Sequence, residues 1–164
     1  MIRPFKPAPG SFRYIYVAID KFSKWIEYKL LVSATAKKVI ELFEDIIHRF
    51  GLPNSIITDL RTIFTGHHFW DICEDRCISI KYVSIAHPRA NGQVKRANGM
   101  IFDALKKRLY QKEEKHPGRW LMELPAVVWG LRTQASRSTG VSPYFLVYGS
   151  EAVLPMYIAF QAPR

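Results

Sequence analysis

Cysteine is scarce in this sequence of 164 residues, which contains only Cys73 and Cys77. Two cysteines do not indicate a secreted domain that is held together by disulfides. His67 and His68 precede the pair, but a structural zinc site usually takes its ligands from a knuckle and a second element. We therefore expect no zinc site here, and we expect both thiols to be buried among apolar side chains.

Long apolar runs are also missing. No run approaches the roughly 20 residues that a membrane-spanning helix needs. The first ten residues contain three prolines and a glycine and lack the apolar centre of a secretory signal. Hydrophobic residues make up 48% of the chain and charged residues 23%, which is typical of one globular domain without membrane contact.

Acidic residues are few in comparison with basic ones. The chain has 14 Asp and Glu against 24 Lys and Arg, which gives a net charge of +10. A basic domain attracts polyanions, and nucleic acid is the commonest of these. Charge alone leaves two interpretations open, a nucleic-acid-binding protein and a generic basic protein.

Apolar periodicity predicts an α/β domain in which helices cover both faces of a mixed sheet. The predicted strands span residues 14–20, 25–31, 55–58 and 78–84. The predicted helices span residues 34–50, 67–77, 93–112 and 119–133, and a last helix begins at Ser142-Pro143 and ends at Gly149. The four tryptophans lie beside apolar periodic positions, so we expect them in the core rather than stacked on bases: Trp25, Trp70, Trp120 and Trp129.

Four segments resemble one known family, in order and at its spacing: residues 14–25, 50–59, 87–94 and 139–149. They are similar to the integrase catalytic core of Gypsy-class LTR retrotransposons, which are relatives of retroviral integrases. The resemblance implies an RNase H-like fold with a mixed five-stranded sheet, of which the first strand is truncated here. It also implies one domain over residues 1–155, followed by a short tail, 156–164, that leads to a missing C-terminal module.

The family's chemistry follows from the same resemblance. Three carboxylates, Asp, Asp and Glu, hold two Mg²⁺ or Mn²⁺ ions, which activate the attacking oxygen and stabilise the leaving oxygen of a phosphoryl transfer. The reactions implied are trimming of DNA ends and strand transfer into a target DNA. The expected partners are DNA and further copies of the chain, and the expected location is the nucleus.

The three carboxylate positions of the family can be located in this sequence. The second falls on Asp59, directly after a predicted strand, and the family's following Asn-Gly is Leu60-Arg61 here. The first would lie one position before Met1 and is therefore absent. Asp20 ends the next strand and is not a metal ligand in the family. The third falls on Lys95.

Lys95 decides the expected activity. A protonated ammonium group has only donors, so it cannot bind Mg²⁺ and repels it instead. We therefore predict an inactive former enzyme with no functional metal site and no cofactor, in which Asp59 is a remnant of the triad. Two placements of Lys95 stay open, an ion pair with Asp59 and a position in solvent. A less favoured alternative is an active nuclease that uses Asp20, Asp59 and a third ligand that we do not identify.

DNA binding does not require the metal site. The loop at residues 87–92 resembles the family's mobile loop at the DNA ends, and a set of polar and basic residues around it is predicted to contact DNA: Arg61, Arg89, Asn91, Gln93, Lys95, Arg96 and Asn98. The alternative is that the charged members of this set are ordinary solvated charges. A further alternative function is a non-catalytic interaction or oligomerisation module, with residues 119–132 supplying the contact face through Trp120 and Trp129.

Overall fold

The fold was analysed in a computed structural model, which describes residue 2 and residues 5–83, 92–110 and 118–153. Each predicted strand and helix is present, with ends at most two residues from the predicted ones in the described parts. Two short helices, η1 and α2, were not predicted. In chain order the elements are η1 (Pro9–Ser11), β1 (Tyr14–Ile19), β2 (Ile26–Leu31), α1 (Ala36–Phe50), β3 (Ser55–Thr58), α2 (Thr62–Thr65), α3 (His67–Asp75), β4 (Ser79–Tyr82), α4 (Gly92–Tyr110), α5 (Trp120–Thr133) and α6 (Pro143–Tyr148).

The sheet is mixed, as predicted, but five strands in one sheet are not seen. Within the described residues β1 pairs with β2 in antiparallel register and β3 pairs with β4 in parallel register, as two separate two-stranded sheets. A trace of a further strand remains beside β1, where the Ile2 N–H donates to the Ile15 carbonyl at 3.1 Å. Among the described residues the predicted five-stranded sheet is therefore present only in part.

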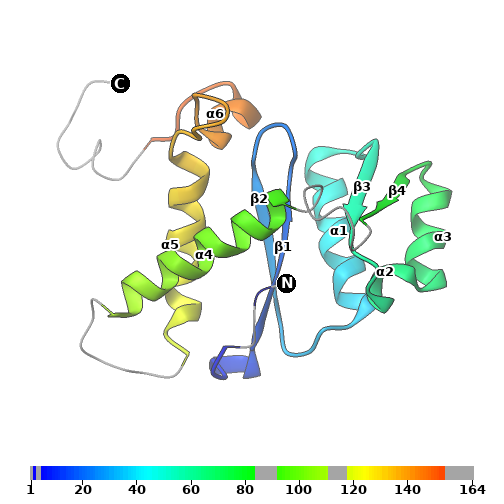
Figure 1. The fold of residues 1–164 in the computed structure, drawn as a ribbon, viewed down its shortest axis with the longest axis horizontal. Helices are drawn as coiled ribbons and strands as arrows, with labels where there is room; N and C mark the ends of the chain where they lie inside the picture. Colours follow the sequence, from blue (N-terminus) through cyan, green and yellow to red (C-terminus); the bar gives the residue numbers. More distant parts are fainter. Residues whose placement is uncertain (1, 3–4, 84–91, 111–117, 154–164) are drawn as a thin grey trace.

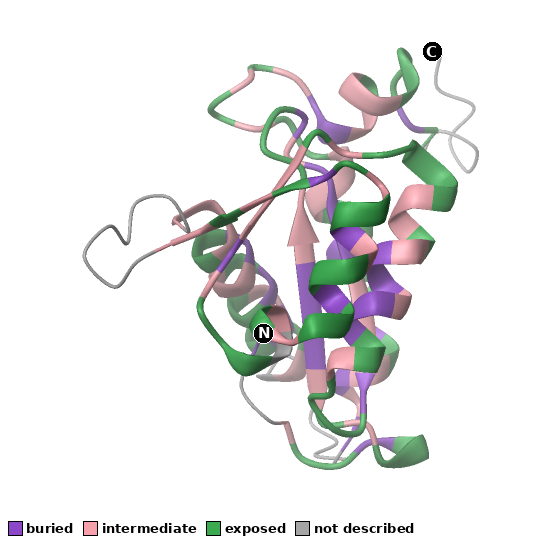
Figure 2. Cartoon of the chain, turned by 90° about the vertical axis from the view of Figure 1, so that its right-hand side faces the viewer, coloured by how far each residue is buried: buried purple, intermediate pink, exposed green. Residues whose placement is uncertain are grey.

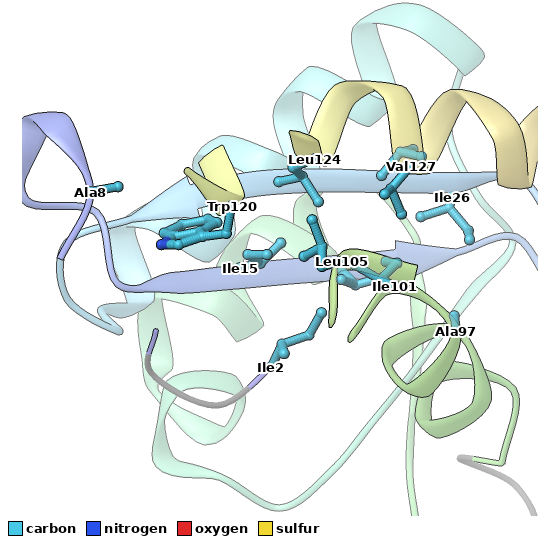
Figure 3. Packing of buried hydrophobic residues seen from close by; sticks show 12 residues of the cluster. Ile2, Ala8, Ile15, Ile26, Ala97, Ile101, Leu105, Trp120, Leu124 and Val127 are labelled. Atoms are coloured by element: carbon cyan, nitrogen blue, oxygen red, sulfur yellow. The ribbon is translucent and has the colours of Figure 1, made fainter. Parts of the chain in front are cut away.

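Helices cover both faces of the β1–β2 hairpin (Figure 1). On one face, α4 and α5 pack against the hairpin, and side chains of these helices converge on Ile15 (Figure 3). On the opposite face, Tyr16 and Leu31 pack with α1, α3 and the β3–β4 pair. Neighbouring residues of a strand point to opposite faces, which is why Ile15 and Tyr16 enter different cores.

Glycine and serine set the ends of two helices. Gly51 has a φ of +84° after α1, and its N–H donates to the Ile47 carbonyl at 2.8 Å. Ser142 begins α6, where its hydroxyl accepts a hydrogen bond from the Phe145 N–H at 2.9 Å. Gly149 ends the same helix at a φ of +73°. These ends lie where the sequence predicts them, because capping requires few neighbours.

Two predictions about burial are wrong in part. Trp25 and Trp120 are buried, but Trp70 and Trp129 are exposed because they lie on the outer faces of α3 and α5. Figure 2 shows helices with buried residues on one side and exposed residues on the other. Cys73 is buried as expected, whereas Cys77 is exposed in the turn that follows the end of α3 at Asp75.

Candidate functional site

Asp59 lies where the β3 strand ends, and Arg61 holds its carboxylate. The preceding residue, Thr58, is buried, whereas the Asp59 side chain is 39% exposed. Its Oδ2 atom forms an ion pair with the Arg61 guanidinium, whose Nε atom lies 3.2 Å away. Its Oδ1 atom is buried and has no hydrogen-bond partner among the described residues. One oxygen is thus neutralised, and the other faces the protein without a donor.

Tyr16 marks the β1 side of this site. Burial raises the pKa of the Tyr16 hydroxyl, the nearby Arg61 guanidinium lowers it, and the Asp59 carboxylate raises it again. Both charges of the ion pair therefore act on this phenol. The Tyr16 hydroxyl oxygen is buried and has no hydrogen-bond partner within the described part of the chain. The site thus contains two buried oxygen atoms, from Tyr16 and Asp59, that lack partners.

Lys95 does not take the place of a metal beside Asp59. It is exposed near the start of α4 and makes no ion pair with any described residue. Of the two placements that the sequence leaves open, the structure has Lys95 in solvent, and Arg61 makes the ion pair instead. Arg61 lies two residues from Asp59 in the same loop, so a short side-chain rotation suffices for contact. A contact with Lys95 would have to bridge two elements.

Asp20 is engaged in a turn. Its Oδ2 atom accepts three hydrogen bonds, from the Phe22 N–H at 3.1 Å, the Ser23 N–H at 2.6 Å and the Ser23 hydroxyl at 2.7 Å. This is the usual role of an aspartate that closes a turn on its own backbone. The oxygen that accepts these bonds is committed to the β1–β2 turn, which gives no support to a nuclease built on Asp20 and Asp59.

The predicted DNA contacts are only partly within the described structure. Arg96 is exposed on α4, and the buried Oδ1 atom of Asn98 has no hydrogen-bond partner in the described ranges. Gln93 accepts a hydrogen bond from the Lys24 ammonium at 3.3 Å, so the start of α4 lies beside the β1–β2 turn. This contact could not be predicted from sequence, because 69 positions separate the two residues. Arg89 and Asn91 lie outside the described residues.

The side chains at this site do not fit a pair of divalent metal ions. Two ions in such a site need several hard oxygen ligands that also offset their charge. Asp59 offers one carboxylate, which is already paired with Arg61. No group of three or more His, Cys, Asp or Glu residues in the described ranges is arranged to hold a metal ion.

Two curated viral polyproteins contain a segment similar to this chain, although no family model matches it. The Gag-Pol polyprotein of avian reticuloendotheliosis virus is 33% identical over 143 residues, which are 87% of this chain and 12% of that polyprotein. The Pol polyprotein of radiation murine leukemia virus (strain Kaplan) is 29% identical over 160 residues, 97% of this chain and 26% of that protein. The chain therefore spans only a small part of these relatives.

Solved structures of integrases share the fold. The HTLV-2 integrase catalytic core domain in complex with magnesium (trimeric form) superposes with a TM-score of 0.66 and 21% identity, over 84% of this chain and 85% of that one. A chain of the simian T-cell lymphotropic virus intasome in complex with PP2A regulatory subunit B56 gamma superposes with a TM-score of 0.74 and 20% sequence identity. The match covers 94% of this chain and 54% of that one. None of the described helices is long and apolar enough to cross a membrane. The chain is therefore similar to segments of these viral Gag-Pol and Pol polyproteins, and it shares the mixed α/β fold of solved integrase catalytic core domains.

Proposed function

We propose that this chain is a degenerate integrase core of a Gypsy-class LTR retrotransposon, a nuclear protein that binds DNA without cutting or joining it. The observation that carries the proposal is the charge at the remnant metal position. Arg61 contacts Asp59 at 3.2 Å, and Lys95 stands where the resemblance places the third carboxylate. The HTLV-2 core was solved with magnesium, whereas this arrangement of charges opposes a divalent cation.

The remaining positive charge supports DNA binding. The chain carries a net charge of +10, and Lys95, Arg96 and Lys107 are exposed along α4. Arg108 on the same helix pairs with Glu123 at 3.1 Å, so its charge is partly offset. A row of cations on one rigid helix can contact successive phosphates of a duplex, and each contact releases counterions from the DNA. Lys95 strengthens this attraction, because it puts a positive charge where the family has a carboxylate.

A joint measurement of joining and binding tests this function. With Mg²⁺ or Mn²⁺ we expect no joined product from a strand-transfer assay on paired DNA ends. Three phosphate contacts would give a slope of about −2.7 in a plot of log affinity against log salt, or about 40-fold weaker binding at 200 mM than at 50 mM. The Lys95→Gln, Arg96→Gln double variant should lose about two phosphate contacts and so make the slope shallower by about 1.8. Joined product contradicts the inactivity, and a flat salt plot contradicts the binding mode.

The outer face of α5 supports a second candidate function, self-association. Met122 is 81% exposed there, and Trp129 is 39% exposed. Trp129 lines a pocket of about 420 Å³ together with Tyr28, Pro125, Ala126, Val128 and Arg132. Large apolar side chains on an outer helix face are typical of an interface. The HTLV-2 core domain has been solved in dimeric and trimeric forms.

Light scattering tests this second function. If copies of the chain associate through α5, the Trp129→Ala variant should shift the molar mass toward that of a monomer, because it removes a large aromatic side chain from that face. Phe22→Ala is the control, since Phe22 is also aromatic and is even more exposed, at 77%, but lies in the β1–β2 turn. An equal shift in both variants, or a monomeric parent protein, contradicts association through α5.

A further inference from the structure

We propose that Arg61 is a tethered counter-ion, which occupies Asp59 in place of a divalent cation and keeps such cations from binding there. This inference rests on the proposed function only in taking Asp59 as the remnant metal position. From its charge Arg61 is predicted only to contact DNA, and the family that the chain resembles has Asn-Gly in place of Leu60-Arg61. The guanidinium group is suited to the role, because it stays protonated at every accessible pH and offers a fixed set of donors.

The backbone holds Arg61 in place for this contact. Its carbonyl accepts a hydrogen bond from the Phe64 N–H at 2.8 Å, so Arg61 caps the first turn of α2. The Phe64 carbonyl in turn accepts from the Tyr82 hydroxyl at 2.9 Å, which attaches α2 to the β4 strand. Trp70 donates to the same hydroxyl at 2.6 Å. The loop that carries Arg61 is therefore fixed to the sheet that carries Asp59.

Asp59 is fixed by the same sheet. It directly follows β3, which pairs with β4 residue by residue from Ser55↔Ser79 to Thr58↔Tyr82. Tyr82 therefore connects the two parts of the site. Its backbone pairs with Thr58, next to Asp59, and its hydroxyl donates to α2, next to Arg61. The ion pair joins two groups whose backbones are already positioned, so less side-chain freedom is lost when it forms than in a pair between mobile groups.

The electrostatics favour the guanidinium over a metal ion. Asp59 and Arg61 together have no net charge, so a dication gains no attraction from the pair and is repelled by Arg61 at close range. The buried Oδ1 atom of Asp59 has no donor within the described structure, but it is not accessible to a hydrated ion from solvent. A cation must therefore displace Arg61 from Oδ2 before it can bind the carboxylate. Removing the guanidinium charge should restore the ordinary affinity of a carboxylate for divalent ions.

Paramagnetic broadening by Mn²⁺ tests the proposal without DNA. In the full chain with labelled backbone amides, we expect Mn²⁺ to leave the signals of Thr58, Asp59 and Tyr16 almost unchanged. In the Arg61→Gln variant the same signals should broaden at least about tenfold more per added Mn²⁺, because one repulsive charge a few ångströms away has been removed. Arg61 is half exposed, and circular dichroism will show that the variant keeps its fold.

Two further variants isolate the cause. Arg61→Lys keeps the positive charge and should stay as insensitive to Mn²⁺ as the parent protein, while Asp59→Asn added to Arg61→Gln should remove the broadening. Strong broadening at Asp59 in the parent, no gain in Arg61→Gln, or equal gains in the Gln and Lys variants would each overturn the proposal. None of these results depends on DNA binding or joining, so failure here is distinct from failure of the proposed function.

Discussion

Replacing Glu27 by alanine is expected to lower the free energy of unfolding by about 3 kcal/mol, because it removes a buried carboxylate and leaves the half-buried guanidinium of Arg132 without its partner. The Glu27 side chain is only 8% exposed. Its carboxylate accepts hydrogen bonds from the Trp25 indole at 2.7 Å and from Arg49 at 3.1 and 2.9 Å, and it pairs with Arg132 at 3.2 Å. Three elements, β2, α1 and α5, therefore meet at one charge.

Arg132 explains why the loss should be large. Burial lowers the pKa of its guanidinium, and the Glu27 carboxylate gives the main opposing effect. Arg132 cannot swing out to water without further loss, since it donates to the Ile26 carbonyl at 2.9 and 2.6 Å and lies 4.3 Å from the Trp25 ring centroid. Without Glu27, the half-buried positive charge of Arg132 would keep only the Ile26 carbonyl and the Trp25 ring as partners among these contacts.

Urea unfolding followed by circular dichroism measures this change. Asp45→Ala is the matched control, because Asp45 also ends an ion pair, with Lys29 at 2.9 Å, but more than half of its side chain is exposed. Removing a solvated partner should change the free energy of unfolding by no more than about 0.5 kcal/mol. If Glu27→Ala costs no more than this control, the network does not hold the three elements together.

The sequence predicts the elements well where local rules decide them. The apolar stripe of α1 is one example, since Val39, Ile40 and Phe43 recur at helical spacing and all three are buried. The sheet was predicted less well. Its strands are apparent from composition, but their pairing depends on contacts between distant segments, and next to β1 the described residues add only the isolated bridge at Ile2.

The candidate site shows the same division between local and distant information. The position of Asp59 after β3 follows from the strand pattern and the resemblance, and the structure has it there. Its partner was not predicted, because the choice between Arg61 and Lys95 depends on where loop and helix lie in space. Asp20 could have been assigned to a turn from sequence, since an aspartate followed three residues later by Ser23 is a common turn pattern.

Leu124→Ala should lower the free energy of unfolding by about 3 kcal/mol, through lost burial and the cavity that remains. Leu124 lies on the inner side of α5, is fully buried, and belongs to the core that α4 and α5 form with β1 and β2 (Figure 3). Ala97 and Ile101 of α4, which lie in the same core, are fully buried as well. A core with helices on one side and a two-stranded hairpin on the other has little freedom to collapse into the new space.

Met122→Ala on the same helix is the control for this change. Met122 lies two residues away on the outer face and is largely exposed, so its loss should alter the free energy of unfolding by no more than about 0.5 kcal/mol. Both variants change helix propensity little, because Leu, Met and Ala are all good helix formers. A large difference between them in urea unfolding can then come only from burial. Equal effects would mean that α5 does not pack against the hairpin, and the surface proposed for self-association would have to be assigned to the other side of the helix.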